Sequence, residues 1–112
     1  MPNGIKVLSE LKETIALTQQ MDLSRDGNTF VLKIMGQYMD TNPISSGVPT
    51  NIIPSSGIIA PVLINRTGGP THVIGYASLR ADGYMDVIEP SGGTYIQPTG
   101  VTIYGEIVWI LP

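Results

Sequence analysis

Residues 73–88 read Val-Ile-Gly-Tyr-Ala-Ser-Leu-Arg-Ala-Asp-Gly-Tyr-Met-Asp-Val-Ile, and this stretch decides the fold of the chain. It contains two runs of β-forming residues with Asp82-Gly83 between them. Asp-Gly is a strong hairpin signal because a type I′ turn requires positive φ at both central residues. We therefore predict antiparallel strands at His72–Leu79 and Tyr84–Ile88, joined by a tight turn.

Short strands and turns continue on both sides of this hairpin. Turns rich in Gly and Pro are expected at Arg66–Pro70 and Glu89–Gly93. The strands expected around them are Val62–Asn65, Thr94–Gln97, Val101–Tyr104 and Glu106–Leu111. Short strands at this spacing are typical of a sandwich or barrel. The expected fold is mainly β with an N-terminal α-helix, and its β part is a small antiparallel sandwich or barrel of the jelly-roll kind.

The first half of the chain has a different character. Leu8, Leu11 and Ile15 follow the i, i+3, i+7 spacing of one helical face, which predicts a helix over residues 4–21. This helix either packs on its own domain or forms a bundle with other copies. A turn is expected at Asp22–Asn28. The domain boundaries are therefore placed at 1–27 for helix and turn and 28–112 for the β-domain.

Between these parts, the apolar run at 29–35 fits a strand, although a helix stays open at this length. Residues 36–61 hold four prolines, which cannot donate to a β ladder. We expect extended chain there, with a short strand at 57–60.

Composition excludes several classes of protein. The formal net charge of -3 argues against nucleic-acid binding, which needs clustered Lys and Arg. The chain has no Cys and a single His, so thiolate and multi-His metal sites are excluded. No run is long and apolar enough for a membrane span, and residues 1–16 lack a signal-peptide pattern. Charged residues make up 13%, against about 25% in typical domains, which indicates that other chains cover part of the surface.

The motifs that could carry catalysis are incomplete. Ser9-Glu-Leu-Lys12 matches S-x-x-K, but the accompanying S-D-N and K-T-G elements are missing. Asp22 could open a calcium loop, yet the twelfth position, which should be Glu, is Lys33. His72 has no G-x-S-x-G partner. We expect no enzyme activity, no cofactor and no metal.

The apolar run at 107–111 contains Trp109 and no charge. A continuous apolar strand indicates burial on both faces. Trp109 is therefore expected in the core or at a subunit interface.

Three pieces of the second half carry a family resemblance. They are Ile58–Leu63, Val73–Ile88, and Tyr95-Ile-Gln-Pro98 together with Val101–Ile110. They resemble the C-terminal β-domains of bacteriophage tail-fibre and baseplate proteins. The predicted helix followed by a small β-domain is also similar to receptor-binding and tail-tip proteins of siphophages that infect Gram-positive bacteria.

This resemblance implies a phage structural protein of the tail tip, baseplate or fibre. It would be made in the host cytoplasm and built into the virion as a homo-oligomer, a trimer, beside other virion proteins. The candidate oligomer interface comprises Leu8, Leu11, Ile15 and Trp109. The loops 66–71 and 91–95, chosen for their turn chemistry and their flanking polar or aromatic groups, would contact a host cell-wall glycan or a neighbouring virion protein. The candidate contact residues are Arg66, His72 and Tyr95. The alternatives are a head-decoration or connector protein without receptor contact, and a small trimeric enzyme of the dUTPase sort.

Overall fold

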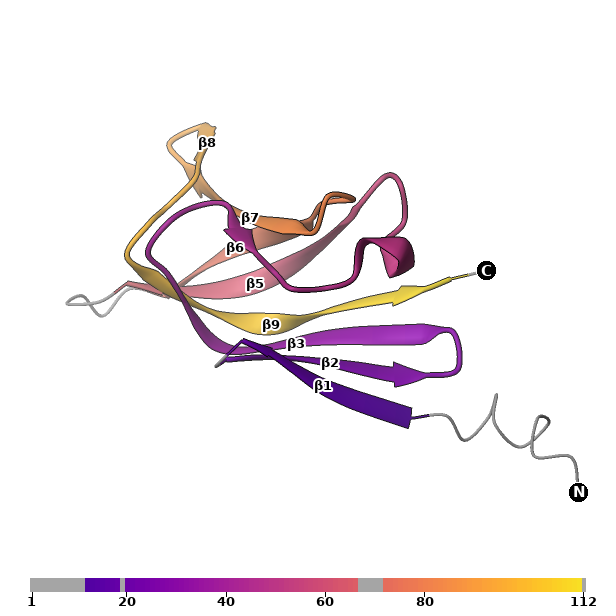
Figure 1. Ribbon diagram of the computed structural model, residues 1–112. Coiled ribbons are helices and arrows are strands. Elements are labelled where there is room, and N and C mark those ends of the chain that lie inside the picture. Colours follow the sequence, from indigo (N-terminus) through magenta and orange to yellow (C-terminus); the bar gives the residue numbers. More distant parts are fainter. Residues whose placement is uncertain (1–11, 19, 67–71, 112) are drawn as a thin grey trace, which may run out of the picture.

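The computed structural model describes residues 12–18, 20–66 and 72–111, and almost all of this chain is β-structure (Figure 1). A single 3₁₀ turn, Thr50–Ile52, is the helical element among the described residues. The strands are β1 (Lys12–Thr18), β2 (Met21–Asp26), β3 (Thr29–Met39), β4 (Ile44–Ser45), β5 (Ile58–Arg66), β6 (His72–Leu79), β7 (Tyr84–Ser91), β8 (Thr94–Ile96) and β9 (Val101–Ile110).

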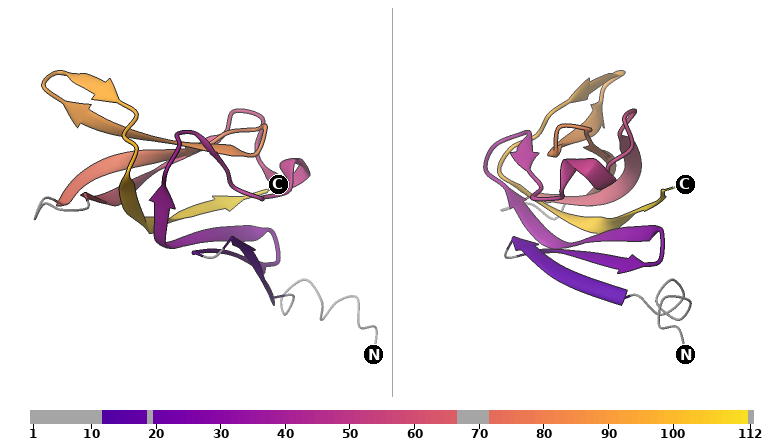
Figure 2. Two further views of the ribbon diagram at one scale, coloured as in Figure 1. Left: turned by 60° about the vertical axis from the view of Figure 1, so that its left-hand side comes forward. Right: turned by 45° about the vertical axis from the view of Figure 1, so that its right-hand side comes forward.

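The strands form one antiparallel sheet in the order β1-β2-β3-β9-β5-β6-β7-β4, and β8 pairs with β7 outside this path. The sheet curls into an open half-barrel (Figure 2). The mainly antiparallel β class expected from the sequence is confirmed. The strand predicted at His72–Leu79 has the expected bounds, and the β6–β7 hairpin follows it. The type I′ turn expected at Asp82-Gly83 is wrong, because Gly83 has a positive φ of 89° whereas Asp82 does not have a positive φ.

The N-terminal helix predicted over residues 4–21 is wrong where the chain is described, because residues 12–18 form β1. The turn predicted at Asp22–Asn28 is also wrong in its first part, since Met21–Asp26 is β2. β1 and β2 pair antiparallel, with Ile15 opposite Leu23. The helix prediction rested on the spacing of three leucine and isoleucine residues. In the structure, the backbone N–H and C=O groups of β1 instead form hydrogen bonds through pairing with β2. Residues 4–11, with Leu8 and Leu11, lie outside the described residues.

Other predicted boundaries also change, because pairing with neighbouring strands joins short runs into longer strands. Residues 29–35 belong to β3, which settles the open choice in favour of a strand. The two runs predicted near the C-terminus are one strand, β9, and the runs at 57–60 and 62–65 are one strand, β5. Glu89–Ser91, expected in a turn, continues β7.

The hydrophobic core fills the concave side of the curled sheet. It takes alternate side chains from β2, β3, β5, β6, β7 and β9, as the period of two requires. Trp109 belongs to this core: its ring stacks on Phe30 at 5.5 Å between centroids, and its Nε1 donates to the Ile52 carbonyl at 2.7 Å. The largest fully buried side chains are Met21, Leu32, Met39, Ile64, Leu79, Met85, Ile103 and Ile107.

Candidate binding surfaces

The outer side of the sheet is apolar although nothing in the described chain covers it. Large hydrophobic side chains there are between 39% and 69% exposed. They come from four neighbouring strands, β3, β9, β5 and β6. We call this surface the outer apolar face, and its residues are Met35, Ile59, Ile74, Tyr76, Tyr104, Val108 and Ile110.

Strand register makes the outer apolar face continuous. Met35 pairs with Tyr104, Tyr104 pairs with Leu63, and Leu63 pairs with Ile74, so one apolar row crosses all four strands. Directly paired residues in an antiparallel sheet point to the same face. The row therefore presents one surface rather than scattered side chains.

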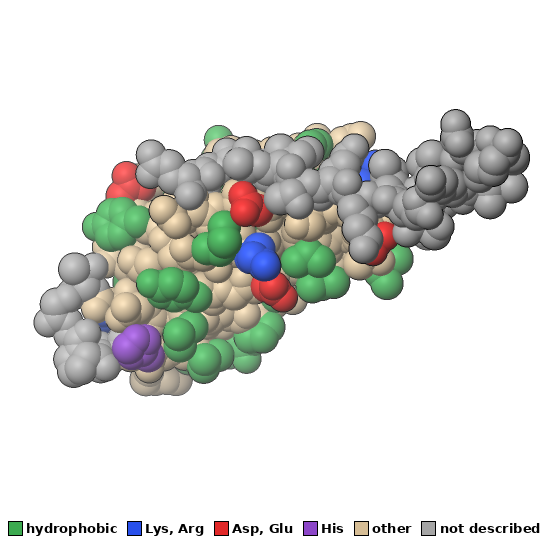
Figure 3. Space-filling model, turned by 90° about the horizontal axis from the view of Figure 1, so that it is seen from below, with side chains coloured by type: hydrophobic (Ala, Val, Ile, Leu, Met, Phe, Trp, Pro, Cys, Tyr) green, Lys and Arg blue, Asp and Glu red, His purple; other side chains and the backbone are tan. Residues whose placement is uncertain are grey.

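Charge on this face is sparse. Lys33 pairs with Glu106 across β3 and β9, and hydrophobic side chains surround the charged groups in the view from below (Figure 3). A fully exposed large side chain presents about 150–250 Å². Seven such side chains, each exposed by roughly half, present several hundred Å². That is the size at which an exposed apolar patch marks an interaction site.

A buried ion pair lies at the end of the sheet where β5 ends. Arg66 Nη2 donates to Glu89 Oε2 at 2.6 Å. The Glu89 side chain is only 7% exposed, whereas that of Arg66 is 36% exposed. Glu89 Oε1 is buried and makes no hydrogen bond to the described residues. This carboxylate therefore depends on Arg66 for its charge partner.

The β7–β8 hairpin stands away from the body of the molecule (Figure 2). Every residue from 90 to 97 is exposed, and Cβ atoms built at Gly92 and Gly93 would meet nothing within 4 Å. Tyr95 is 66% exposed and Ile96 is 39% exposed, and as consecutive strand residues they point to opposite faces. We call residues 90–97 the arm.

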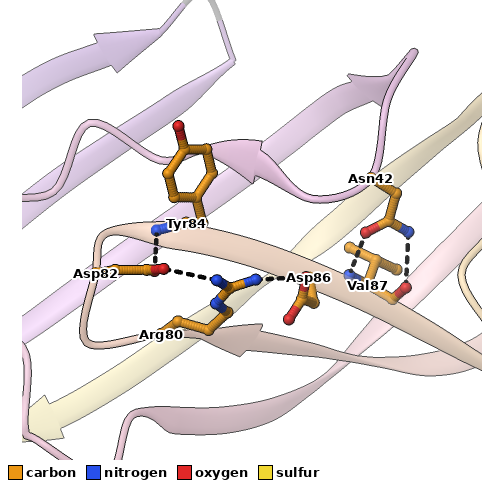
Figure 4. Close-up of polar contacts among 6 residues, drawn as sticks. All are labelled: Asn42, Arg80, Asp82, Tyr84, Asp86 and Val87. Atoms are coloured by element: carbon orange, nitrogen blue, oxygen red, sulfur yellow. Dashed lines mark hydrogen bonds and ion pairs between the residues drawn. The ribbon is translucent and has the colours of Figure 1, made fainter.

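Asn42 holds the base of the arm. Its Nδ2 donates to the carbonyls of Val87 at 2.8 Å and Pro98 at 2.9 Å, and its Oδ1 accepts from the Val87 N–H at 3.1 Å. The side chain thus acts as a strand partner for β7 (Figure 4). Both legs of the arm are tied to the sheet through this one residue.

The β6–β7 turn carries the charged cluster of the described chain. Arg80 donates to Asp82 at 2.6 Å and to Asp86 at 3.4 Å, and its guanidinium lies 5.8 Å from the Tyr84 ring centroid (Figure 4). The Tyr84 N–H bonds Asp82 Oδ1 and, with Arg80, holds the pKa of Asp82 below its usual 3.8. The hydrogen bond to Asp82 raises the pKa of Arg80. These groups satisfy one another and stabilise the turn.

The three predicted ligand-contact residues gather at one end of the sheet without forming a single cluster. Arg66 lies on the inner side, paired with Glu89. His72 is exposed at the start of β6, opposite Asn65. Tyr95 is exposed on the arm, one residue before Ile96, which pairs with Glu89.

The sequence analysis missed the outer apolar face, although one signal for it was present. The charge-free run at 107–111 predicts burial on both faces, and the structure buries Ile107 and Trp109 while leaving Val108 and Ile110 exposed. This strand is apolar on both sides, and the described chain covers only one of them.

Within the described ranges, no group of three or more His, Asp or Glu side chains is placed to hold a metal ion. No helix there is long and apolar enough to cross a membrane. No known protein family, curated protein or solved structure matches this chain.

Proposed function

We propose that this protein is a structural component of a bacteriophage virion, in the tail tip, baseplate or fibre, and that it works by binding. The observation that carries this proposal is the outer apolar face. A protein acting alone would expose several hundred Å² of hydrophobic side chain to water, whereas a subunit of an assembly buries it.

The low charge of the chain agrees with this role. With 13% charged residues, the exposed surface has little of the charge that keeps small monomers soluble. The proposed partners are other copies of the chain, as a trimer, and other virion proteins. Many copies on one particle would give strong attachment to a host cell-wall glycan from weak single contacts.

The proposed contacts with the glycan are Arg66, His72 and Tyr95. Aromatic and imidazole side chains present an apolar body and a polar tip, which suits sugar rings. His72 is exposed beside Asn65, and Arg66 follows Asn65 in β5. The arm that carries Tyr95 begins one residue after Glu89, the partner of Arg66.

Binding of fluorescently labelled full-length protein to host cells tests this assignment. His72→Ala and Tyr95→Ala are each expected to weaken binding, while Ser56→Ala, at an exposed turn elsewhere, keeps it. Unchanged binding by both variants would sink the glycan assignment.

A head-decoration or connector protein is the second candidate, because it would bury the same outer apolar face without contacting a receptor. Presence of the protein in purified virions, together with no binding of any form to host cells, would favour it. A dUTPase-like activity would instead show as a rise in melting temperature on adding nucleotide and magnesium. We expect no such rise.

A further inference from the structure

We infer that the arm packs onto the outer apolar face of a neighbouring copy of this chain. The inference rests on the proposed function, since it requires the protein to assemble. In this arrangement, the arm of one copy covers the outer apolar face of another copy.

The arm lacks partners on both of its faces. A two-stranded hairpin is marginally stable on its own in water and needs a third strand or a packed face. Here all residues from 90 to 97 are exposed, and Tyr95 and Ile96 point to opposite sides. Contact with a second molecule would supply the missing cover.

The base of the arm is firmly held, so its direction is set before any partner arrives. The Arg66–Glu89 ion pair lies directly before the arm, near the end of β7. Asn42 hydrogen-bonds to Val87, which precedes the arm, and to Pro98, which follows it. A preformed arm loses little conformational freedom on docking. These contacts hold the arm away from its own sheet, where it is free to reach a neighbour.

The chemistry of the two surfaces matches. Residues 90–97 read Pro-Ser-Gly-Gly-Thr-Tyr-Ile-Gln and contain no charge. Aromatic side chains are the usual anchors of protein interfaces, and Tyr95 is the most exposed of the aromatic rings described. The outer apolar face offers a broad surface with one Lys33–Glu106 pair in it.

Size argues against two arms pairing with each other. A stable interface uses about 20–30 residues a side and buries about 800 Å² per partner. The arm has only residues 90–97, so two arms alone fall short. In an exchanged pair or a ring, each copy gives both its arm and its outer apolar face, so more residues of each copy take part than in a contact between two arms.

This arrangement has a consequence for symmetry. A contact between two different surfaces closes either as a two-fold pair, in which each copy docks its arm on the other copy's face, or as a ring of three or more copies. The trimer expected from the sequence is the smallest ring of this kind.

Light scattering coupled to size exclusion of the full chain tests the contact. Wild type is expected as an assembly, near three times 12.0 kDa for a ring of three copies or near twice 12.0 kDa for an exchanged pair. Tyr95→Ser on the arm and Ile74→Lys on the face are each expected to reduce the mass to one chain. The matched controls are Tyr84→Ser, an aromatic at the β6–β7 turn, and Ser56→Lys, a charge at another exposed site; both should keep the wild-type mass.

Mixing the two variants gives the sharpest result. Tyr95→Ser keeps an intact face and Ile74→Lys keeps an intact arm, so the mixture can form one good contact per pair. We expect a species of two chains, near twice 12.0 kDa, and nothing larger. A two-fold symmetric, face-to-face contact would give a different result, because Tyr95→Ser has an intact face and would already form a species of two chains before mixing.

Each variant is first compared with wild type by thermal unfolding, and a misfolded one is replaced by Ile96→Lys for the arm or Val108→Lys for the face. If folded arm variants keep the wild-type mass, the inference is wrong, but the proposed function as a self-assembling structural protein is not affected. A monomeric wild type would overturn the inference together with self-assembly. Host-cell binding separates the two proposals further. The inference moves Tyr95 from the proposed glycan contact to the contact between copies. His72→Ala should therefore lose binding at full mass, whereas Tyr95→Ser should lose it through a fall in mass.

Discussion

Two hairpins share strand β7 and differ in what covers them. The β6–β7 turn is packed: Ser46 donates both its N–H and its Oγ to the Gly83 carbonyl, at 2.9 and 2.6 Å, and Thr50 and Val48 lie beside Gly83. At the β7–β8 turn, nothing would come within 4 Å of a Cβ at Gly93. The glycines have nearly equal φ values, 89° at Gly83 and 88° at Gly93.

This difference separates local turn chemistry from packing. Both turns use glycine to reach a backbone conformation that other residues adopt at a cost. Only the first is tied into the core by its neighbours. The chain therefore holds the arm in position at its base, while the described residues give its tip no packing contact.

The largest expected effect comes from Gly75→Ala, at the point where β7 leaves β6. A Cβ there would lie 2.5 Å from the Ile88 carbonyl oxygen and would also clash with Ile64 Cδ1. Paired residues between β6 and β7 end at Tyr76 and Ile88, so the clash would push the root of the arm off the sheet. We expect a loss of about 3 kcal/mol in the free energy of unfolding by urea denaturation.

Ser78→Ala is the control, because it lies on the same strand and is partly exposed. If Gly75→Ala is as stable as this control, the base of the arm does not need the close approach of Gly75 to the Ile88 carbonyl.

A smaller loss is expected from Arg66→Ala. The Glu89 carboxylate would remain buried without its charge partner, which costs about 3–5 kcal/mol for a fully buried pair. Because the Arg66 side chain is 36% exposed, we expect about 2 kcal/mol. The measurement is again urea denaturation.

The double variant Arg66→Ala with Glu89→Gln should recover most of this loss, since Gln carries no charge to leave unpaired. No recovery would mean that Arg66 acts through packing rather than through its charge.

The smallest effects are expected from alanine substitutions in the two turns, Gly83→Ala between β6 and β7 and Gly93→Ala between β7 and β8. Alanine in the left-handed region costs about 1–2 kcal/mol. Gly83→Ala should lose this amount from global stability. Gly93→Ala should change global stability by less than about 0.5 kcal/mol, since the arm opens without the core. Both are measured in the Tyr95→Ser background, where the arm is undocked, and equal losses would contradict the comparison.

Much of the fold could be predicted because its signals are local. Alternation of side chains and the Asp82-Gly83 turn placed the β6–β7 hairpin correctly, and Trp109 was expected in a core or interface. The ends of β5, β7 and β9 were missed, because strand length depends on which neighbour is available to pair. The helix predicted from the spacing of Leu8, Leu11 and Ile15 failed because nothing in the local sequence shows that β2 pairs with residues 12–18.

For the candidate sites, sequence reasoning found the exposed residues Tyr95 and His72 from turn chemistry and residue type. It did not find that Arg66 is paired with Glu89, a contact between residues 23 apart in the chain. It also could not separate the covered side of an apolar strand from the uncovered side.

Residue type and near neighbours were enough to predict the β class, the turn between β6 and β7 and the scarcity of charge. The tertiary structure alone decided that Ile107 is buried and Val108 exposed, that β1 is a strand, and that one hairpin is covered and the other is not. The physical reason is that burial and pairing are properties of contacts between distant segments, and these exist only once the sheet has curled.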